Sequence, residues 1–136
     1  MAERIRVVDY YYVTSPDKPG EGAEVLSIFK GARVNLLAIH VFPQGRRVQV
    51  DLVPSNPAAF LRAARKAKLK LSGKKKAFLV TGDDRTGVLA GVLDKLGEAR
   101  VNVTALTALG AGKKRFGAIF WVKPPDMRRA SKALGV

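Results

Sequence analysis

The sequence has no cysteine and a single histidine among its 136 residues. Without cysteine the chain has no disulfide framework, no thiol nucleophile and no thiolate metal site. The one histidine, His40, lies in an apolar stretch, and a zinc site built on imidazoles would require partners that the sequence lacks. No nucleophile and base occur at a spacing typical of covalent catalysis. We therefore expect no enzyme activity, no metal and no cofactor.

Long apolar runs are also missing. No stretch approaches the ~18 apolar residues of a membrane span. Residues 1–6 lack the apolar core of a signal peptide. These two absences predict a cytoplasmic protein that makes no contact with a membrane.

Acidic residues are few: Asp and Glu number 11 against 25 Lys and Arg, which gives a net charge of +14. Eight of the basic residues fall between Arg62 and Lys76. Such a density can indicate a nucleic-acid partner, but it is also typical of a solvated helix face and linker that keep a protein soluble. We favour the solvated surface, and nucleic acid is therefore not the expected partner.

An internal repeat organises the chain. When the sequence is shifted by 67 positions, the run from Val13 to Gly45 matches a second run without a gap. Ala32-Arg33-Val34-Asn35 is identical to Ala99-Arg100-Val101-Asn102, and Asp17–Gly20 falls on Asp84–Gly87. Such self-similarity indicates a duplicated structural unit. It predicts a first module over residues 1–73 and a second over 74–136, divided near Gly73.

Each copy is expected to follow the order strand, helix, strand, strand, helix, strand, which is the ferredoxin-like α+β order. This order makes an antiparallel sheet with helices on one face, and we expect the sheets of the two copies side by side. A short fourth strand is expected at 68–72 in the first copy. The second copy lacks a clear final strand, and residues 2–8 are a candidate to fill that edge. Expected strands are 5–14, 34–42, 46–53, 77–81, 101–109 and 115–123, with helices ending near 30, 67, 97 and 134.

The repeated motifs resemble the ACT domain. In that family a polar residue, a basic residue, proline and glycine precede the first helix, and Val-Asn-Ile starts the second strand. Here Asp17-Lys18-Pro19-Gly20 is followed by Val34-Asn35-Leu36, and the second copy repeats the pattern at the same spacing. Three features depart from the family pattern. Thr86 replaces the proline, Glu21-Gly22 replaces apolar residues, and the last strand is missing.

The resemblance implies a non-catalytic regulatory protein that binds an amino acid or a related small ligand. Domains of this family regulate enzymes or transcription, and they usually pair side by side, within a chain or in a homodimer. Their ligand lies at the interface of the pair, so that the Asp17–Gly20 loop would face Asn102 and the Asp84–Gly87 loop would face Asn35. The ligand-binding residues carried over are Asp17, Gly20, Asn35, Asp84, Gly87 and Asn102.

These residue types suit a zwitterionic ligand. A glycine at a helix start lets a ligand approach the backbone, and the helix N-terminus attracts a carboxylate. An aspartate can accept from an ammonium group, and an asparagine offers both a donor and an acceptor. The same residues can also serve only local structure, with aspartate in a turn and asparagine after a helix.

Two other functions share the expected fold. One is RNA binding, because the ferredoxin-like order is also that of the RRM module, whose third strand carries aromatic residues. The segment Lys114–Trp121 partly fits that strand, and Phe78 lies where the first strand would add another aromatic. Ala118 stands where a stacking aromatic is required, so the platform would be incomplete. The other function is a protein–protein interaction module without a ligand.

Overall fold

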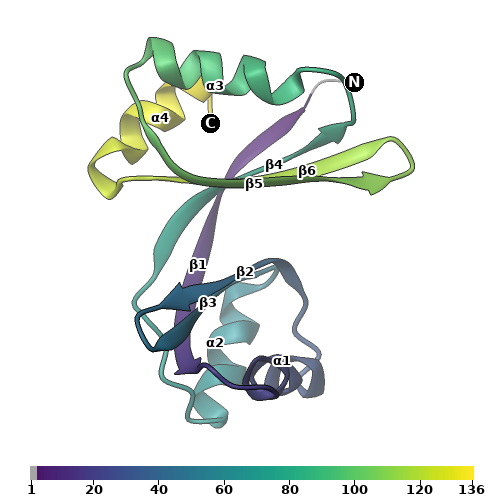
Figure 1. The fold of residues 1–136 in the computed structure, drawn as a ribbon, viewed down its shortest axis with the longest axis vertical. Helices are drawn as coiled ribbons and strands as arrows, with labels where there is room; N and C mark the ends of the chain where they lie inside the picture. Colours follow the sequence, from purple (N-terminus) through teal and green to yellow (C-terminus); the bar gives the residue numbers. More distant parts are fainter. Residues whose placement is uncertain (1–2) are drawn as a thin grey trace. The chain divides into compact units, whose positions relative to one another are not determined.

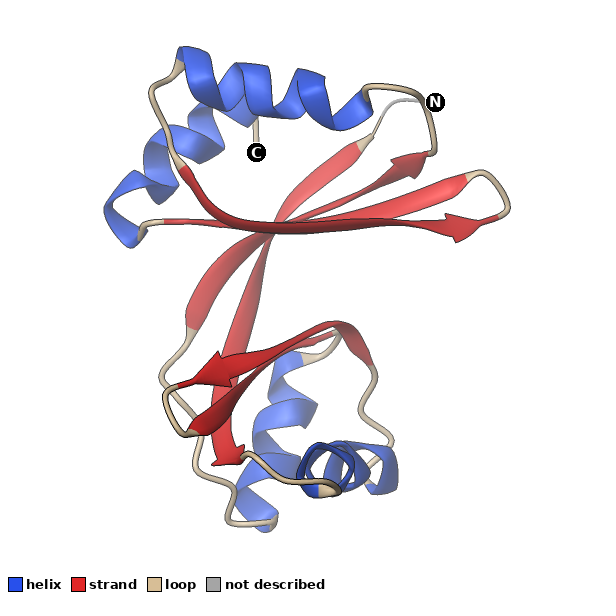
Figure 2. Ribbon diagram, viewed as in Figure 1, coloured by secondary structure: helices blue, strands red, loops and turns tan. Residues whose placement is uncertain are grey.

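The computed structural model describes residues 3–136 and shows an α+β protein with six strands and four α-helices (Figures 1 and 2). The chain forms two compact units. One is Asp9–Lys75, called the first module below. The other, the second module, joins Lys76–Val136 to the described part of Met1–Val8. The division lies close to Gly73, but residues 3–8 lie with the second module rather than with the first.

The first module contains the later part of β1 (Arg4–Pro16), which is antiparallel to the strand Arg47–Pro54. That strand is in turn antiparallel to Leu36–Gln44. Both helices lie on one side of these strands (Figure 2). The phenyl rings of Phe29 and Phe60 stack at 4.5 Å between centroids, and Tyr11 stacks on Phe60 at 5.4 Å. These rings form the centre of the core. The other elements are α1 (Glu21–Gly31), β2 (Leu36–Gln44), β3 (Arg47–Pro54) and α2 (Pro57–Lys66).

The fourth strand expected at 68–72 is wrong, because this segment is irregular. Leu69 and Leu71 pack against the core of the first module. The Ser72 amide donates to the Tyr12 carbonyl at 2.9 Å, but the Tyr12 amide donates to the Ser72 hydroxyl rather than to a carbonyl. A side-chain acceptor in place of a backbone one interrupts the ladder of hydrogen bonds that defines a strand.

In the second module the sheet runs from β1, whose early part belongs to this module, through the strands Lys75–Asp83, Arg115–Val122 and Val103–Gly112, in that order. Ile5 and Val7 pack against the core of this module. A Cβ atom on Gly82 would lie 2.9 Å from the Cα of Glu3, so the two backbones touch. The prediction that the N-terminal segment fills the open edge is confirmed. The other elements are β4 (Lys75–Asp83), α3 (Val88–Glu98), β5 (Val103–Gly112), β6 (Arg115–Val122), a 3₁₀ turn (Pro124–Asp126) and α4 (Met127–Leu134).

The repeated Ala-Arg-Val-Asn motif ends the first helix of each module. After α1, the Val34 amide donates to the Phe29 carbonyl and the Arg33 amide to the Lys30 carbonyl. This pair of bonds defines a Schellman motif, with Arg33 left-handed at φ 58°. Val101 and Arg100 make the equivalent bonds after α3, and Lys68 is left-handed at the corresponding place after α2. No helix in the described part of the chain is long and apolar enough to cross a membrane.

Candidate functional site

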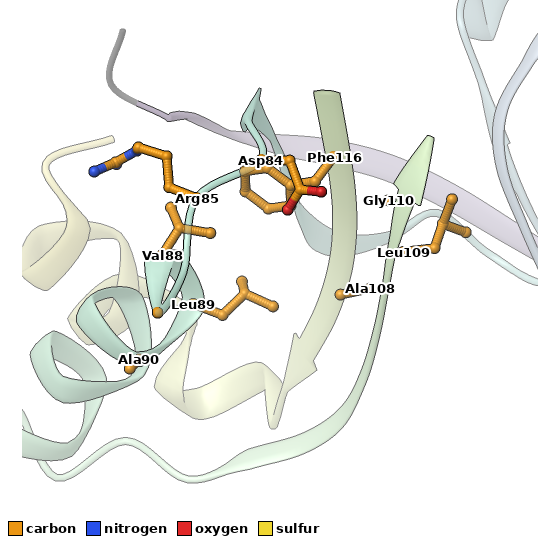
Figure 3. A pocket seen from close by; sticks show the side chains of 10 residues that line it. Asp84, Arg85, Val88, Leu89, Ala90, Ala108, Leu109, Gly110 and Phe116 are labelled. Atoms are coloured by element: carbon orange, nitrogen blue, oxygen red, sulfur yellow. The ribbon is translucent and has the colours of Figure 1, made fainter. Parts of the chain in front are cut away.

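A hollow of about 310 Å³ opens in the second module between the start of α3 and the far end of β5 (Figure 3). The loop after β4 forms one wall, and the β5–β6 hairpin forms the other. A site of this volume is at the small end of the range for small-molecule pockets. The hollow is lined by Asp84, Arg85, Gly87, Val88, Leu89, Ala90, Ala108, Leu109, Gly110 and Phe116.

The loop wall is held in place by two local features. The Asp84 amide donates to the Lys114 carbonyl at 2.8 Å, which ties the loop to the hairpin. Gly87 is the N-cap of α3 and is left-handed at φ 77°, a conformation that favours glycine. Glycine has no side chain that could cap the helix. The Val88 amide donates to the Arg85 carbonyl at 3.3 Å and the Ala90 amide to the Gly87 carbonyl at 3.0 Å, so the feature that favours an anionic group here is the partial positive charge of the helix N-terminus.

The carboxylate of Asp84 lies next to β5. A Cβ atom on Gly110 would be 3.3 Å from Asp84 Oδ2, so the missing side chain at Gly110 makes room for the carboxylate. The neighbouring Arg85 takes a different direction (Figure 3). Its Nη2 donates to Glu3 Oε2 at 3.0 Å. The negative charge available to a ligand at this end of the hollow is therefore that of Asp84.

Apolar side chains line the rest of the hollow. Val88 and Leu89 come from the first turn of α3, Ala108 from β5 and Phe116 from β6. Phe116 is buried at 6% exposure, whereas Val88 and Leu89 are half-buried. A carboxylate and a helix N-terminus beside an apolar wall suit a small ligand that carries both charges and an apolar group.

The first module has the same loop but different walls. Gly20 is again a left-handed N-cap, at φ 92°, and Asp17 stands in the place of Asp84. Pro43, paired with Val48, occupies the position of Gly110, which pairs with Phe116. Glu21-Gly22 replaces Val88-Leu89, and Glu21 forms an ion pair with Lys18 at 3.6 Å. The apolar wall and the space beside the aspartate are thus specific to the second module.

The two asparagines lie at the other end of their sheets. Asn102 precedes the start of β5, eight residues from Gly110, which corresponds to roughly 26 Å along a strand. The Asn35 carbonyl accepts from the Ser55 amide at 3.0 Å and from its hydroxyl at 3.1 Å. Within the second module, Asp84 and Gly87 therefore lie together and Asn102 lies apart. The expectation that each asparagine faces the loop of the other copy concerns both modules and stays a prediction.

The residues Leu89, Gly110 and Phe116 were not among the expected site residues. Gly110-Ala111-Gly112 was a visible signal, since β5 carries a register irregularity between Gly110 and Gly112. Bulges of this kind are frequent next to functional sites because they redirect the chain. The β2–β3 hairpin of the first module has no such irregularity near its turn. An alignment of the two copies by sequence alone does not reveal this difference.

The lone histidine is part of a polar pair in the first module. His40 Nδ1 lies 3.9 Å from Asp51 Oδ2, and Gln49 Nε2 donates to Asp51 Oδ1 at 2.9 Å. Asp51 is buried, and this burial raises the pKa of its carboxyl group. Within residues 3–136, no group of three or more His, Cys, Asp or Glu side chains is close enough to hold a metal ion.

The aromatic residues that suggested an RNA platform form the core of the second module. Phe78 and Phe120 are 0% exposed and their rings stack at 5.0 Å between centroids. Together with Phe116 they pack against side chains of α3 and α4. A base stacks only on an accessible ring. The RNA-binding alternative based on these strands is therefore wrong.

No family model matches the sequence, and no curated protein matches it significantly. A protein from Bacteroides thetaiotaomicron superposes with a TM-score of 0.81 at 16% identity, over 96% of this chain and 88% of that one. The ligand-free regulatory subunit of aspartate kinase from Thermus thermophilus gives 0.62 at 15% identity, over 99% and 95%.

The regulatory subunit of aspartate kinase from Thermus flavus gives a TM-score of 0.59 at 14% identity, over 99% of this chain and 95% of that one. In both regulatory subunits the match extends over nearly all of both chains, and not over one module alone. These likenesses confirm the fold that the sequence predicts, a tandem of two α+β modules of the ferredoxin-like order.

Proposed function

We propose that this chain is a non-catalytic regulatory protein that binds an amino acid with an apolar side chain in the hollow of its second module. The observation that supports this most directly is the convergence of three groups on one hollow. These are the Asp84 carboxylate, the N-terminus of α3 after Gly87, and an apolar wall that includes Leu89 and Phe116. In this proposal Asp84 accepts from the ammonium group and the helix N-terminus binds the carboxylate.

Regulation requires that the ligand favour one state of the protein over another. Arg85 follows Asp84 in the loop and forms its ion pair with Glu3, which directly precedes β1. A ligand that orders this loop would therefore stabilise the N-terminal strand on the second module. The regulatory subunits with the same fold support such a role. The regulated partner would be an enzyme or a transcription factor in the cytoplasm, and the chain could act as a homodimer.

Calorimetric titration and thermal melting with the free amino acids test this proposal. A ligand at about 100 times its Kd should stabilise the fold by roughly 2.7 kcal/mol. Asp84→Asn should weaken binding about 10- to 100-fold, because it removes a charged acceptor. Asp17→Asn in the first module is the matched control and should leave the Kd unchanged. If no amino acid at ~10 mM shifts the Tm, ligand sensing is rejected in favour of a ligand-free interaction module.

Two measurements distinguish binding in this hollow from binding between the two copies. They are the number of ligands bound per chain and the Kd of the two asparagine variants. Binding in the hollow gives one ligand per chain, because Pro43 and Glu21 change the first module. Asn35→Ala and Asn102→Ala should then leave the Kd unchanged. A strong loss of affinity in either asparagine variant would instead favour the junction that the ACT resemblance implies.

A further inference from the structure

The stretch from residue 52 to residue 82 contains no aspartate or glutamate, although it carries eight lysines and arginines. Six of these define what we call the basic surface of the first module. All six side chains are exposed. The basic surface consists of Arg62, Arg65, Lys66, Lys68, Lys70 and Lys74.

The fold orients these side chains outward. In α2, Phe60 and Ala64 are buried at 0% and 1% exposure, and Arg62, Arg65 and Lys66 fall on the opposite side of the helix. Beyond the helix, Leu69 and Leu71 pack on the core, and Lys70 between them is exposed. The basic groups therefore continue from the helix along the segment that follows it.

Some basic residues elsewhere in the described structure have acidic partners. Arg85 pairs with Glu3 at 3.0 Å, Arg115 with Asp83 at 3.1 Å and Arg129 with Asp126 at 3.0 Å. Among residues 3–136, none of the six side chains of the basic surface forms an ion pair. The dipole of α2 favours Arg65 and Lys66 in its last turn, but this leaves the other four charges unexplained. Concentrated like charge costs stability through self-repulsion.

The surface around these charges limits the kind of partner. The exposed large apolar residues of the described structure lie in β2, α3, β5 and at Val136, so residues 54–76 contribute none. An interfacial membrane helix needs apolar side chains on its binding face, and a protein interface needs a buried apolar or aromatic centre. A partner that presents repeated negative charge and requires little apolar contact is the phosphodiester backbone of a nucleic acid.

We infer that the basic surface binds the phosphate backbone of nucleic acid without reading its sequence. This inference departs from the solvated surface expected from the sequence, and it does not involve the aromatic residues in the core of the second module. Aromatic platforms for base stacking are absent from residues 54–76, since the one aromatic there, Phe60, is buried. Affinity should therefore depend on charge and salt and only weakly on base composition.

Fluorescence anisotropy tests this with oligo(dT), oligo(U) and a mixed-sequence duplex of about 20 nucleotides or base pairs, between about 0.05 and 0.2 M salt. The full chain should bind at least one of these single strands or the duplex, and its affinity should fall steeply as the salt concentration rises. The triple variant Arg62→Gln, Arg65→Gln, Lys66→Gln should lose at least about tenfold in affinity. Its salt slope should decrease by roughly two to three, since each lost phosphate contact removes about one.

The matched control removes three exposed basic residues from the second module, through Lys95→Gln, Arg128→Gln and Lys132→Gln. It has the same net charge as the α2 variant and should bind within about threefold of the parent chain. Equal losses in both triple variants would show that net charge alone drives binding and would overturn the inference. Absence of binding in all arms at ~0.1 M salt, or binding only to anionic vesicles, would also overturn it. Asp84→Asn should leave this affinity unchanged, so the result is independent of the amino acid site.

Discussion

The carboxylate of Asp84 occupies space that Gly110 leaves open: a Cβ atom on Gly110 would stand 3.3 Å from Asp84 Oδ2. Asp84 lies in the loop before α3, whereas Gly110 lies near the end of β5. The proposed ammonium site therefore depends on a missing side chain on a strand that is distant in sequence. In the first module, the proline at position 43 has a Cβ in the corresponding place.

Gly110→Ala should weaken amino acid binding several-fold, because Asp84 must move by a few tenths of an ångström to accommodate the added methyl group. Stability should change by less than about 1 kcal/mol, since Asp84 is exposed and can adjust. Calorimetric titration and urea unfolding measure the two effects. Gly117→Ala is the control, because its nearest neighbour would be the Val80 carbonyl at an ordinary 3.9 Å. An unchanged Kd for Gly110→Ala would contradict this role of Gly110.

Gly82→Ala should loosen the N-terminal strand from the second module. The new Cβ would be 2.9 Å from the Cα of Glu3, and a backbone atom cannot swing aside as a side chain can. We expect a loss of about 1–3 kcal/mol in the free energy of unfolding, as for other overpacked sites. Hydrogen exchange of residues 4–8 should accelerate relative to exchange in β6. Equal exchange in parent and variant would mean that the strand is not held by this contact.

Arg33→Gly should stabilise the protein by about 0.5–1 kcal/mol, measured by chemical unfolding. Arg33 is left-handed at φ 58°, a conformation that costs a non-glycine residue about 1–2 kcal/mol, and greater chain entropy of glycine in the unfolded state offsets part of the gain. Ala32→Gly is the control one residue earlier. It has a negative φ of −88°, so this change should destabilise. Loss of stability in both variants would show that Arg33 makes a compensating interaction.

Asp51 should make the protein less stable as the pH rises, which is the opposite of the effect of a carboxyl group with a lowered pKa. Because burial raises the pKa of this carboxyl group in the folded state, its contribution is favourable at pH values below the unfolded pKa. That contribution is lost as the pH rises through the folded pKa. Asp51→Asn should therefore be more stable than the parent chain at neutral pH, and the difference should shrink towards pH ~4.

Urea unfolding of both chains across this pH range measures the effect of Asp51. The asparagine can still accept the hydrogen bond from Gln49, so the comparison isolates the charge. Asp94→Asn on the exposed surface of α3 provides the control. A difference between Asp51→Asn and the parent chain that grows towards low pH would contradict the expected direction.

The sequence supported the fold better than the site. The internal repeat and the alternation of apolar and polar residues in the strands can be read directly from the sequence. The missing final strand of the second copy also predicted correctly that the N-terminal segment lies at that edge. The sequence did not predict that residues 68–72 are irregular. The reason is that the Tyr12 amide donates to the hydroxyl of Ser72 and not to a backbone carbonyl. The two asparagines belong to the repeated Ala-Arg-Val-Asn motif. What the two copies of this motif share in the structure is the way they end a helix, with Arg33 and Arg100 at equivalent positions.

The residues of the candidate pocket could be predicted from the sequence only in part. Asp84 and Gly87 were predicted as binding residues from a motif, and both line the hollow. Their neighbours Gly110 and Phe116 come from a hairpin whose register depends on one additional residue in the second copy. Register is set by pairing in three dimensions, and the ungapped alignment of the two copies runs through Gly110–Gly112 without revealing the irregularity there.

The 13-residue strand β1 also has a consequence for the order of assembly. Its early residues are synthesised well before Lys76–Val136, which forms the rest of the second module. Asp9–Lys75 forms a compact unit of its own, whereas the sheet of the second module cannot be completed before Arg115–Val122 has been synthesised. Closing such a distant pairing is slow. A single cut in the chain therefore cannot separate the two modules, because the second one combines segments from before and after the first.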